Sequence, residues 1–332
     1  MFTQLKKIVM PMGVSGDEGD ISAVLAAEIA PYVDKVYNDA LGNLIAFKKG
    51  KGKKPKKLMF AAHMDEIGFM ASYIDEKGFI RVSRLGGINY QAASFSEVIF
   101  KNGTKGVLVP EARIPQRDYR PENYYVDIGA KSKKDAMRRV KIGDTCRVAP
   151  SLFKLAGSRV AGRPIDDRIG CMMLAEAAKA AASFENDTYF VFTVQEEVGV
   201  RGAKTSAFSI TPDYAVAVDI GGAGDMPSCA PLAVNLGEGI AIKLKDAMVI
   251  CNPKMIAMMK EIAEEEKVPY QTEILEGGGT DTCMLQQAAG GCIAGALSVP
   301  TRYGHSAVEV IDMNDVAGGI RILAGLCQKK LN

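Results

Sequence analysis

Two histidines, His63 and His305, are the whole histidine content of this chain of 332 residues. The acidic residues that could join them in a site are Asp166-Asp167, Glu196-Glu197 and Asp219. Imidazole nitrogen and carboxylate oxygen together suit zinc, cobalt or manganese better than magnesium or calcium. These residue types therefore indicate a metal site without a cysteine ligand.

Each of these groups has an ordinary structural explanation when it is taken alone. A single His after a strand is usually a hydrogen-bonded polar residue, and an Asp-Asp pair before a helix is usually a cap. A Glu-Glu pair after a strand usually lies in a solvated loop. Taken together they favour a metal, because both His of the chain fall in the candidate segments and no spare His exists. Carboxylates directly after apolar runs are also costly to bury unless a cation or a hydrogen-bond network compensates.

The number of candidate ligands favours two cations over one. Three protein ligands and a water satisfy a single metal, whereas two His and at least three carboxylates are present. A carboxylate can bridge two cations about 3.5–4 Å apart, which suits the activation of a water for hydrolysis.

Several apolar runs predict the strands that would position these groups, at 58–62, 189–194, 214–218 and 240–244. The first three runs lead directly into His63, Glu196-Glu197 and Asp219. Ligands and catalytic groups collect at the carboxyl ends of strands in open α/β sheets, so we expect one shared crevice.

Helical patterns alternate with these strands at 21–33, 168–184, 254–266 and 314–330. The run 15–18 resembles a cap for the first of them, and Asp166-Asp167 for the second. We therefore expect an α/β fold with an open mixed sheet flanked by helices on both faces.

A β-rich stretch interrupts this pattern. Short alternating runs at 79–82, 96–100, 106–109, 124–128 and 144–148 are separated by turn signals at 76–78 and 102–103, and only 133–139 has a helical pattern. The expected domains are a catalytic domain over 1–67 and 162–332 and an inserted small β-rich domain over 68–161.

Composition excludes several classes of protein. A net charge of +2 gives no reason to expect a nucleic-acid or membrane partner. No apolar run approaches the roughly 18–20 residues that span a bilayer, and the first residues lack a signal-peptide layout. Seven cysteines without a CxxC pair are typical of free thiols, so a cytoplasmic location is expected.

The ordered motifs resemble the M42 family of dinuclear metal aminopeptidases over essentially the whole chain, from Ser15-Gly16-Asp17-Glu18 to the last helix and including the inserted unit. They are His63-x-Asp65, Asp166-Asp167-Arg168, Gln195-Glu196-Glu197-Val198-Gly199, Val218-Asp219, Gly277-Gly278-Gly279-Thr280-Asp281 and Arg302-Tyr303-Gly304-His305-Ser306. One departure is Gly162-Arg163-Pro164, where a Lys or an Ala-like turn is expected. It leaves the ligand positions in place.

The resemblance implies a zinc-peptidase-like catalytic domain with two divalent metal ions, zinc or cobalt, with manganese as a further option. His63, Asp166 and Asp219 would hold one metal. Asp166 would bridge to the second metal, which Glu197 and His305 would complete.

The resemblance also implies catalytic roles and partners. Glu196 would be the general base and acid, and Asp65 would orient His63. Asp166 is preferred to Asp167 because of where the family's ligand falls in its Asp-Asp pair. Substrates would be short peptides, and dimers built through the inserted domain would assemble into a hollow tetrahedral dodecamer.

Three alternatives remain open from the residues. A related dinuclear deacylase or carboxypeptidase would share the metal ligands. An endoglucanase-type glycosidase could use paired acids, although the chain has no Trp and 7% aromatic residues for sugar stacking. Purely structural metals are the third alternative, and such sites tend to be closed and rich in cysteine.

Overall fold

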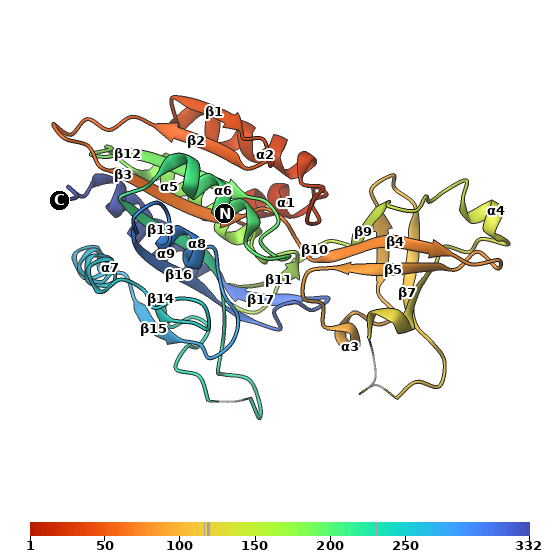
Figure 1. The fold of residues 1–332 in the computed structure, drawn as a ribbon. Coiled ribbons are helices and arrows are strands. Elements are labelled where there is room, and N and C mark those ends of the chain that lie inside the picture. The colour runs from red at the N-terminus through yellow and green to blue at the C-terminus, as the bar shows by residue number, and fades with distance from the viewer. Residues whose placement is uncertain (116, 118–119, 230) are drawn as a thin grey trace.

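The structure, a computed structural model, describes residues 1–115, 117, 120–229 and 231–332. It consists of a large α/β body with a smaller β-barrel beside it (Figure 1). The predicted fold class, an open mixed sheet with helices plus a small β-rich unit, is confirmed. In the described part of the chain, no helix has the length and apolar character needed to cross a membrane.

The large body is built on an eleven-stranded sheet, counted over the described residues, with the order β1-β2-β12-β3-β13-β16-β17-β11-β10; β14 pairs with β16, and β15 with β14. The strands are β1 (Lys35–Asn38), β2 (Leu44–Lys48), β3 (Lys57–His63), β10 (Ser151–Lys154), β11 (Arg159–Arg163), β12 (Asp187–Thr193), β13 (Tyr214–Gly222), β14 (Ile240–Lys245), β15 (Tyr270–Ile274), β16 (Ile293–Arg302) and β17 (Glu309–Asp312). Strands β12, β3, β13 and β16 run parallel, so their carboxyl ends share one edge. The four predicted strands of this sheet are confirmed as β3, β12, β13 and β14.

Strand β16 lies in the middle of the sheet and was not predicted from the sequence. Its run contains Gly295 and Pro300, which ordinarily argue against a central strand. The pairing explains how Pro300 is tolerated. On one side of β16, the residues paired with β14 end at Ser298 and those paired with β17 begin at Thr301. Pro300 therefore lies between the two partner strands.

Helices cover both faces of the sheet, as predicted. One face packs against α1 (Phe2–Val9), α2 (Gly19–Ile29), α5 (Arg168–Ala180), α7 (Pro253–Glu265) and α9 (Met313–Gln328), and the other against α6 (Arg201–Ile210) and α8 (Thr282–Gln286). Helix α6 was not predicted because its buried side, apart from Ile210, is made of small residues, which give little apolar contrast: Gly202, Ala203, Ser206 and Ala207. A short 3₁₀ turn, η1 (Ala30–Tyr32), follows α2.

The smaller body is a closed barrel with the order β4-β5-β8-β7-β6-β9. Its strands are β4 (Gly68–Ile74), β5 (Ile80–Leu85), β6 (Glu97–Phe100), β7 (Lys105–Pro110), β8 (Tyr124–Asp127) and β9 (Thr145–Val148), with short helical segments α3 (Tyr90–Ala93), η3 (Pro121–Asn123) and α4 (Lys133–Ala136). Phe69, Phe100 and Leu108 belong to its own core. The unit expected over 68–161 therefore runs past the last barrel strand and includes β10 and part of β11, which pair in the large sheet.

A buried charge cluster joins the two bodies. Arg147 on β9 and Arg168 at the start of α5 both donate to the Glu66 carboxylate, at 2.9 and 3.3 Å. Both guanidinium groups also donate to main-chain carbonyls at the end of α1, among them that of Pro11. All three charged side chains are buried, so the barrel is fixed to the large body by paired charges.

Candidate metal centre

The sheet places the predicted site residues at one edge. His63 ends β3, and Asp219 lies on β13 two residues past the rung between Ala217 and Ala61. Glu196 follows β12, and His305 follows β16. The structure brings all seven predicted residues together, and six of them line one cavity of about 430 Å³: His63, Asp166, Glu196, Glu197, Asp219 and His305.

Asp166 lies between the two histidines. Its Oδ1 is 3.1 Å from His63 Nε2, and its Oδ2 is 3.1 Å from His305 Nε2. Asp219 approaches His63 Nε2 at 3.8 Å, and Glu197 approaches His305 Nε2 at 3.5 Å. Each histidine therefore lies beside an acidic residue of its own, Asp219 or Glu197. The Asp166 carboxylate lies between these two pairs and directs one oxygen to each.

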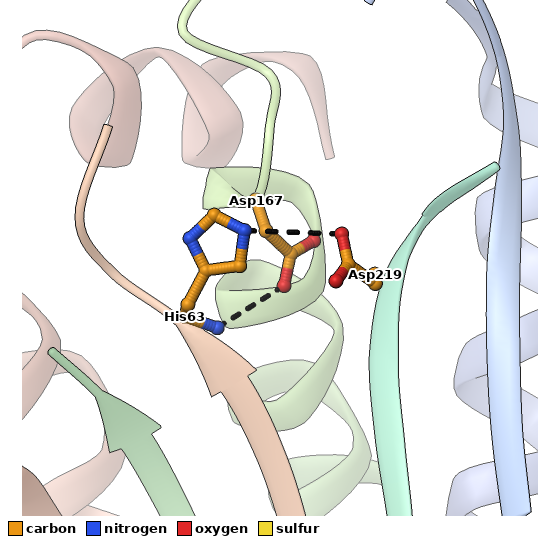
Figure 2. A group of neighbouring side chains, drawn as sticks. All are labelled: His63, Asp167 and Asp219. Atoms are coloured by element: carbon orange, nitrogen blue, oxygen red, sulfur yellow. Dashed lines mark hydrogen bonds and ion pairs between the residues drawn. The ribbon is translucent and has the colours of Figure 1, made fainter. Parts of the chain in front are cut away.

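Asp167 also lies beside His63 but has different partners. Figure 2 shows it with His63 and Asp219, whose possible ligand atoms lie within 4.8 Å of one another. Its two oxygens accept from main-chain N–H groups, those of Gly170 at 3.0 Å and His63 at 3.3 Å. The predicted capping of the helix is confirmed for Asp167, which caps α5 and also holds the end of β3.

Asp65 is fully buried behind His63 and contacts four neighbours. The His63 Nδ1 lies 3.6 Å from Asp65 Oδ1 and 3.1 Å from the Asp65 carbonyl, which leaves Nε2 directed into the cavity. The Asp65 carboxylate also accepts from the main-chain N–H groups of Glu196 at 2.9 Å and Glu197 at 3.3 Å, and from the Ser15 hydroxyl at 2.6 Å. The same carboxylate therefore positions a histidine and both glutamates.

Glu18 supports the same turn and was not predicted to do so. The sequence suggested a cap for α2, but the Glu18 side chain makes no capping bond. Its carboxylate accepts instead from the main-chain N–H of Gly16 at 2.7 Å and of Gln195 at 3.1 Å. Gln195 has a left-handed backbone with φ +55°, which is uncommon for a residue other than glycine. The capping expectation is thus wrong for Glu18, which stabilises the turn before Glu196.

The remaining cavity wall combines apolar residues, glycines and one lysine. The apolar part is formed by Val200, Ile220, Met248 and Leu275. Glycines at 199, 221–222 and 277–279 form much of the rest, together with Thr280. Lys243 faces the cavity but is paired with Glu273 at 2.9 Å.

The barrel also reaches the candidate metal centre. Gly87 lines the cavity, and a Cβ added there would meet the His305 ring at 3.2 Å. The Asn89 N–H donates to the His305 carbonyl at 3.2 Å. The loop between β5 and α3 therefore forms one wall of the site.

Burial and nearby like charges shift the pKa values of the ionisable groups in the site. Burial raises the pKa of Glu197 to about 8 and that of Asp219 to about 7, with nearby Asp166 adding to each. Burial alone would raise the pKa of Asp166 too, but its contacts with His305 and His63 lower it below the usual range. Contact with Asp166 raises the pKa of His305 to about 10. Without cations the centre retains protons that divalent cations would displace, so the donor set and its charge fit such ions.

Known proteins share both the sequence and the fold. The model for the M42 glutamyl aminopeptidase family matches residues 42–322. A putative aminopeptidase of Acetivibrio thermocellus is 46% identical over 97% of both chains. The aminopeptidase APDkam598 of Desulfurococcus kamchatkensis is 33% identical over 99% of this chain and 94% of its own, with a TM-score of 0.94. The TET1 peptidase of Pyrococcus horikoshii, which can assemble into a tetrahedron or a large octahedral shell, is 33% identical over 98% of both chains, with a TM-score of 0.87.

The pKa shifts predict how stability depends on pH. Glu197, Asp219 and His305 all have folded pKa values above their ordinary ones, so the stability they contribute is present at low pH and lost as pH rises. We expect the metal-free protein to melt at a lower temperature at about pH 8.5 than at about pH 6. Added cobalt should raise the melting temperature more at the higher pH, because it binds the deprotonated groups.

Thermal melting of chelator-treated and cobalt-loaded protein at both pH values measures this difference. A cobalt-induced increase that is equal at the two pH values, or larger at about pH 6, would contradict it.

Proposed function

The chain belongs to the M42 peptidase family and is a metal-dependent aminopeptidase, and we propose that it removes N-terminal residues from short peptides with two divalent cations. The single observation that carries the proposal is Asp166, whose two oxygens are divided between His63 and His305 at 3.1 Å each. A carboxylate in that position suits a bridge between two cations.

The proposed ligand sets are those that the family resemblance implies, and the acidic neighbours of each histidine support them. His63, Asp166 and Asp219 would hold one cation, and Asp166, Glu197 and His305 the other. Nitrogen and oxygen donors without sulfur favour zinc or cobalt, with manganese as a further option. Asp167 is left out because both of its oxygens already accept main-chain N–H groups.

The residues around these ligands divide the remaining chemistry. When bound, the cations supply electrostatic stabilisation of the developing negative charge and activate the attacking water. Glu196 is proposed as the general base that takes the proton of that water and returns it to the leaving amine. It faces the cavity with Oε2 3.9 Å from His63 Nε2, and burial raises its pKa well above the ordinary value. Asp65 is proposed to orient His63.

We also propose that the substrate's free α-amine is bound beside the metal centre. The cavity of about 430 Å³ is closed on one side by the barrel loop at Gly87, so it has room for few substrate residues. Burial of an unblocked N-terminus next to acidic groups would select an amino end over an internal peptide bond.

A comparison of substrates tests this activity. We expect hydrolysis of aminoacyl anilides that is abolished by a chelator and restored by zinc or cobalt, with metal analysis giving two ions per chain. N-acetylated peptides should react much more slowly than free ones. Equal rates on blocked and free peptides would indicate a deacylase or endopeptidase, and chelator-resistant cleavage of carboxymethylcellulose would indicate a glycosidase.

Variants of the two adjacent glutamates separate the base from the ligand. Glu196→Gln keeps the size of the side chain but cannot accept a proton, so we expect normal metal content and a loss of turnover of about 10²–10⁴-fold. Glu197→Gln should weaken metal binding, with activity partly recovered at high metal concentration. Glu261→Gln on α7, an exposed position, is the control and should match the parent protein. Metal loss confined to Glu196→Gln would reverse the assignment.

We further propose that the chain forms a homo-oligomer through the barrel, with dimers assembling into a dodecamer. The support is that the barrel exposes large apolar side chains outside its own core: Tyr73, Phe95, Met137 and Ile142.

A cytoplasmic location is proposed because all seven cysteines are free thiols, which are typical of reducing compartments. Cell fractionation checks this location.

Light scattering at micromolar concentration tests the assembly. The parent protein should have the mass of many subunits, and Phe95→Asp should lower it by placing a charge in the contact. Phe208→Asp, at an exposed position on α6 outside the barrel, is the matched control and should keep the parent's mass. A fully active monomer would show that the barrel does not serve assembly.

A further inference from the structure

Glu309, at the start of β17, is a buried acid that no motif singled out. It is 1% exposed, and its carboxylate accepts three main-chain hydrogen bonds. Oε2 accepts from Ile165 at 2.7 Å and from Asp166 at 3.1 Å, and Oε1 accepts from His305 at 3.2 Å. One side chain therefore holds the backbone of two residues that face each other across the centre.

The sheet explains why Glu309 can reach both segments. Strand β17 lies between β16 and β11, and Glu309 is paired with Gly162 near the end of β11. The chain leaves β11 toward Asp166 and leaves β16 toward His305, so both segments pass the start of β17. The two segments are otherwise distant in sequence and meet at the Asp166 Oδ2 to His305 Nε2 contact of 3.1 Å.

His305 in particular depends on such support. Its φ of +58° is in the left-handed region, which is unfavourable for a residue other than glycine and persists only where the surroundings fix it. Main-chain contacts fix the loop on both sides of His305. Glu309 accepts its N–H, Asn89 donates to its carbonyl, and Arg163 donates to the carbonyl of Ser306 at 2.7 Å.

We propose that Glu309 is a positioning residue that sets the geometry of the cation site formed by Glu197, His305 and the shared Asp166. This inference rests on the ligand assignment of the proposed function. Loss of the Glu309 contacts should affect the His305 side more than the His63 side, because His63 has its own support from Asp65 and Asp167.

Glu309→Gln tests the proposal with cobalt as the probe. The variant keeps the shape, but one carboxylate oxygen becomes an NH₂ group that cannot accept a hydrogen bond, so at least one contact is lost in either orientation. Cobalt titration followed by absorption spectroscopy should show one tight site retained and a second weakened by about 10–100-fold. Activity should fall at low cobalt and recover at saturating cobalt. Glu309→Asp, which keeps both acceptor oxygens, should restore part of the second affinity.

Asp315→Asn is the matched control. Asp315 is also 1% exposed and accepts two main-chain N–H groups at 2.8 Å, from Gly237 and Gly239, but it lies outside the metal centre. The Asp315→Asn variant should have a lower melting temperature than the parent protein and unchanged affinities at both cobalt sites.

The outcomes distinguish this inference from the function on which it rests. Equal destabilisation by Glu309→Gln and Asp315→Asn, with both cobalt sites intact in each, would show that Glu309 is merely structural and overturn the inference. The same conclusion follows if Glu309→Gln fails to fold and Glu309→Asp binds two cobalt ions with the parent's affinities. A parent protein that binds only one cobalt would instead contradict the proposed function.

Discussion

Acidic groups crowd around Asp166, and the rest of the catalytic body must hold them in place against their mutual repulsion. A carboxylate in contact with two imidazole rings must be held from several directions, since its acidic neighbours Glu197 and Asp219 repel it. Strand ends from one sheet edge provide that restraint, because parallel strands deliver their carboxyl ends to the same place at fixed spacing. The raised pKa values show how unfavourable the arrangement is when protons must stand in for cations.

A second set of buried acids acts on the backbone rather than toward the cavity. Asp65 accepts from the N–H groups of both glutamates, Asp167 from that of His63, and Glu309 from those of Asp166 and His305. Main-chain N–H groups at the ends of strands lack ladder partners, and a carboxylate can satisfy two or three of them at once. Fixing the backbone in this way fixes the direction of the side chain it carries, which outer contacts of metal sites commonly do.

The strands and site residues that could be predicted are those whose function requires a recognisable local pattern in the sequence. Continuous apolar runs predicted β3, β12, β13 and β14, whereas β16 was missed because its glycine and proline are tolerated only by its particular pairing. Ligand candidates stood out by residue type and position after strands. Glu18 and Glu309 did not, because each acts through hydrogen bonds to distant main-chain groups that no local spacing encodes. Residue type and spacing did not separate Asp166 from Asp167; the preference for Asp166 came from the family resemblance, and the partners of each oxygen support it.

The place of the barrel in the chain has a consequence for the order in which the protein folds. His63 and Asp166 are separated by 103 residues, and most of that interval forms the barrel. Its first and last strands, β4 and β9, pair with each other, so a folded barrel holds its two ends side by side. The open loop between these two proposed ligands then shrinks to about 26 residues, from His63 to Phe69 and from Cys146 to Asp166. This shortening lowers the entropic cost of loop closure by on the order of 1 kcal/mol. If the barrel folds first, it therefore holds the segments that carry His63 and Asp166 near each other before the large sheet is complete.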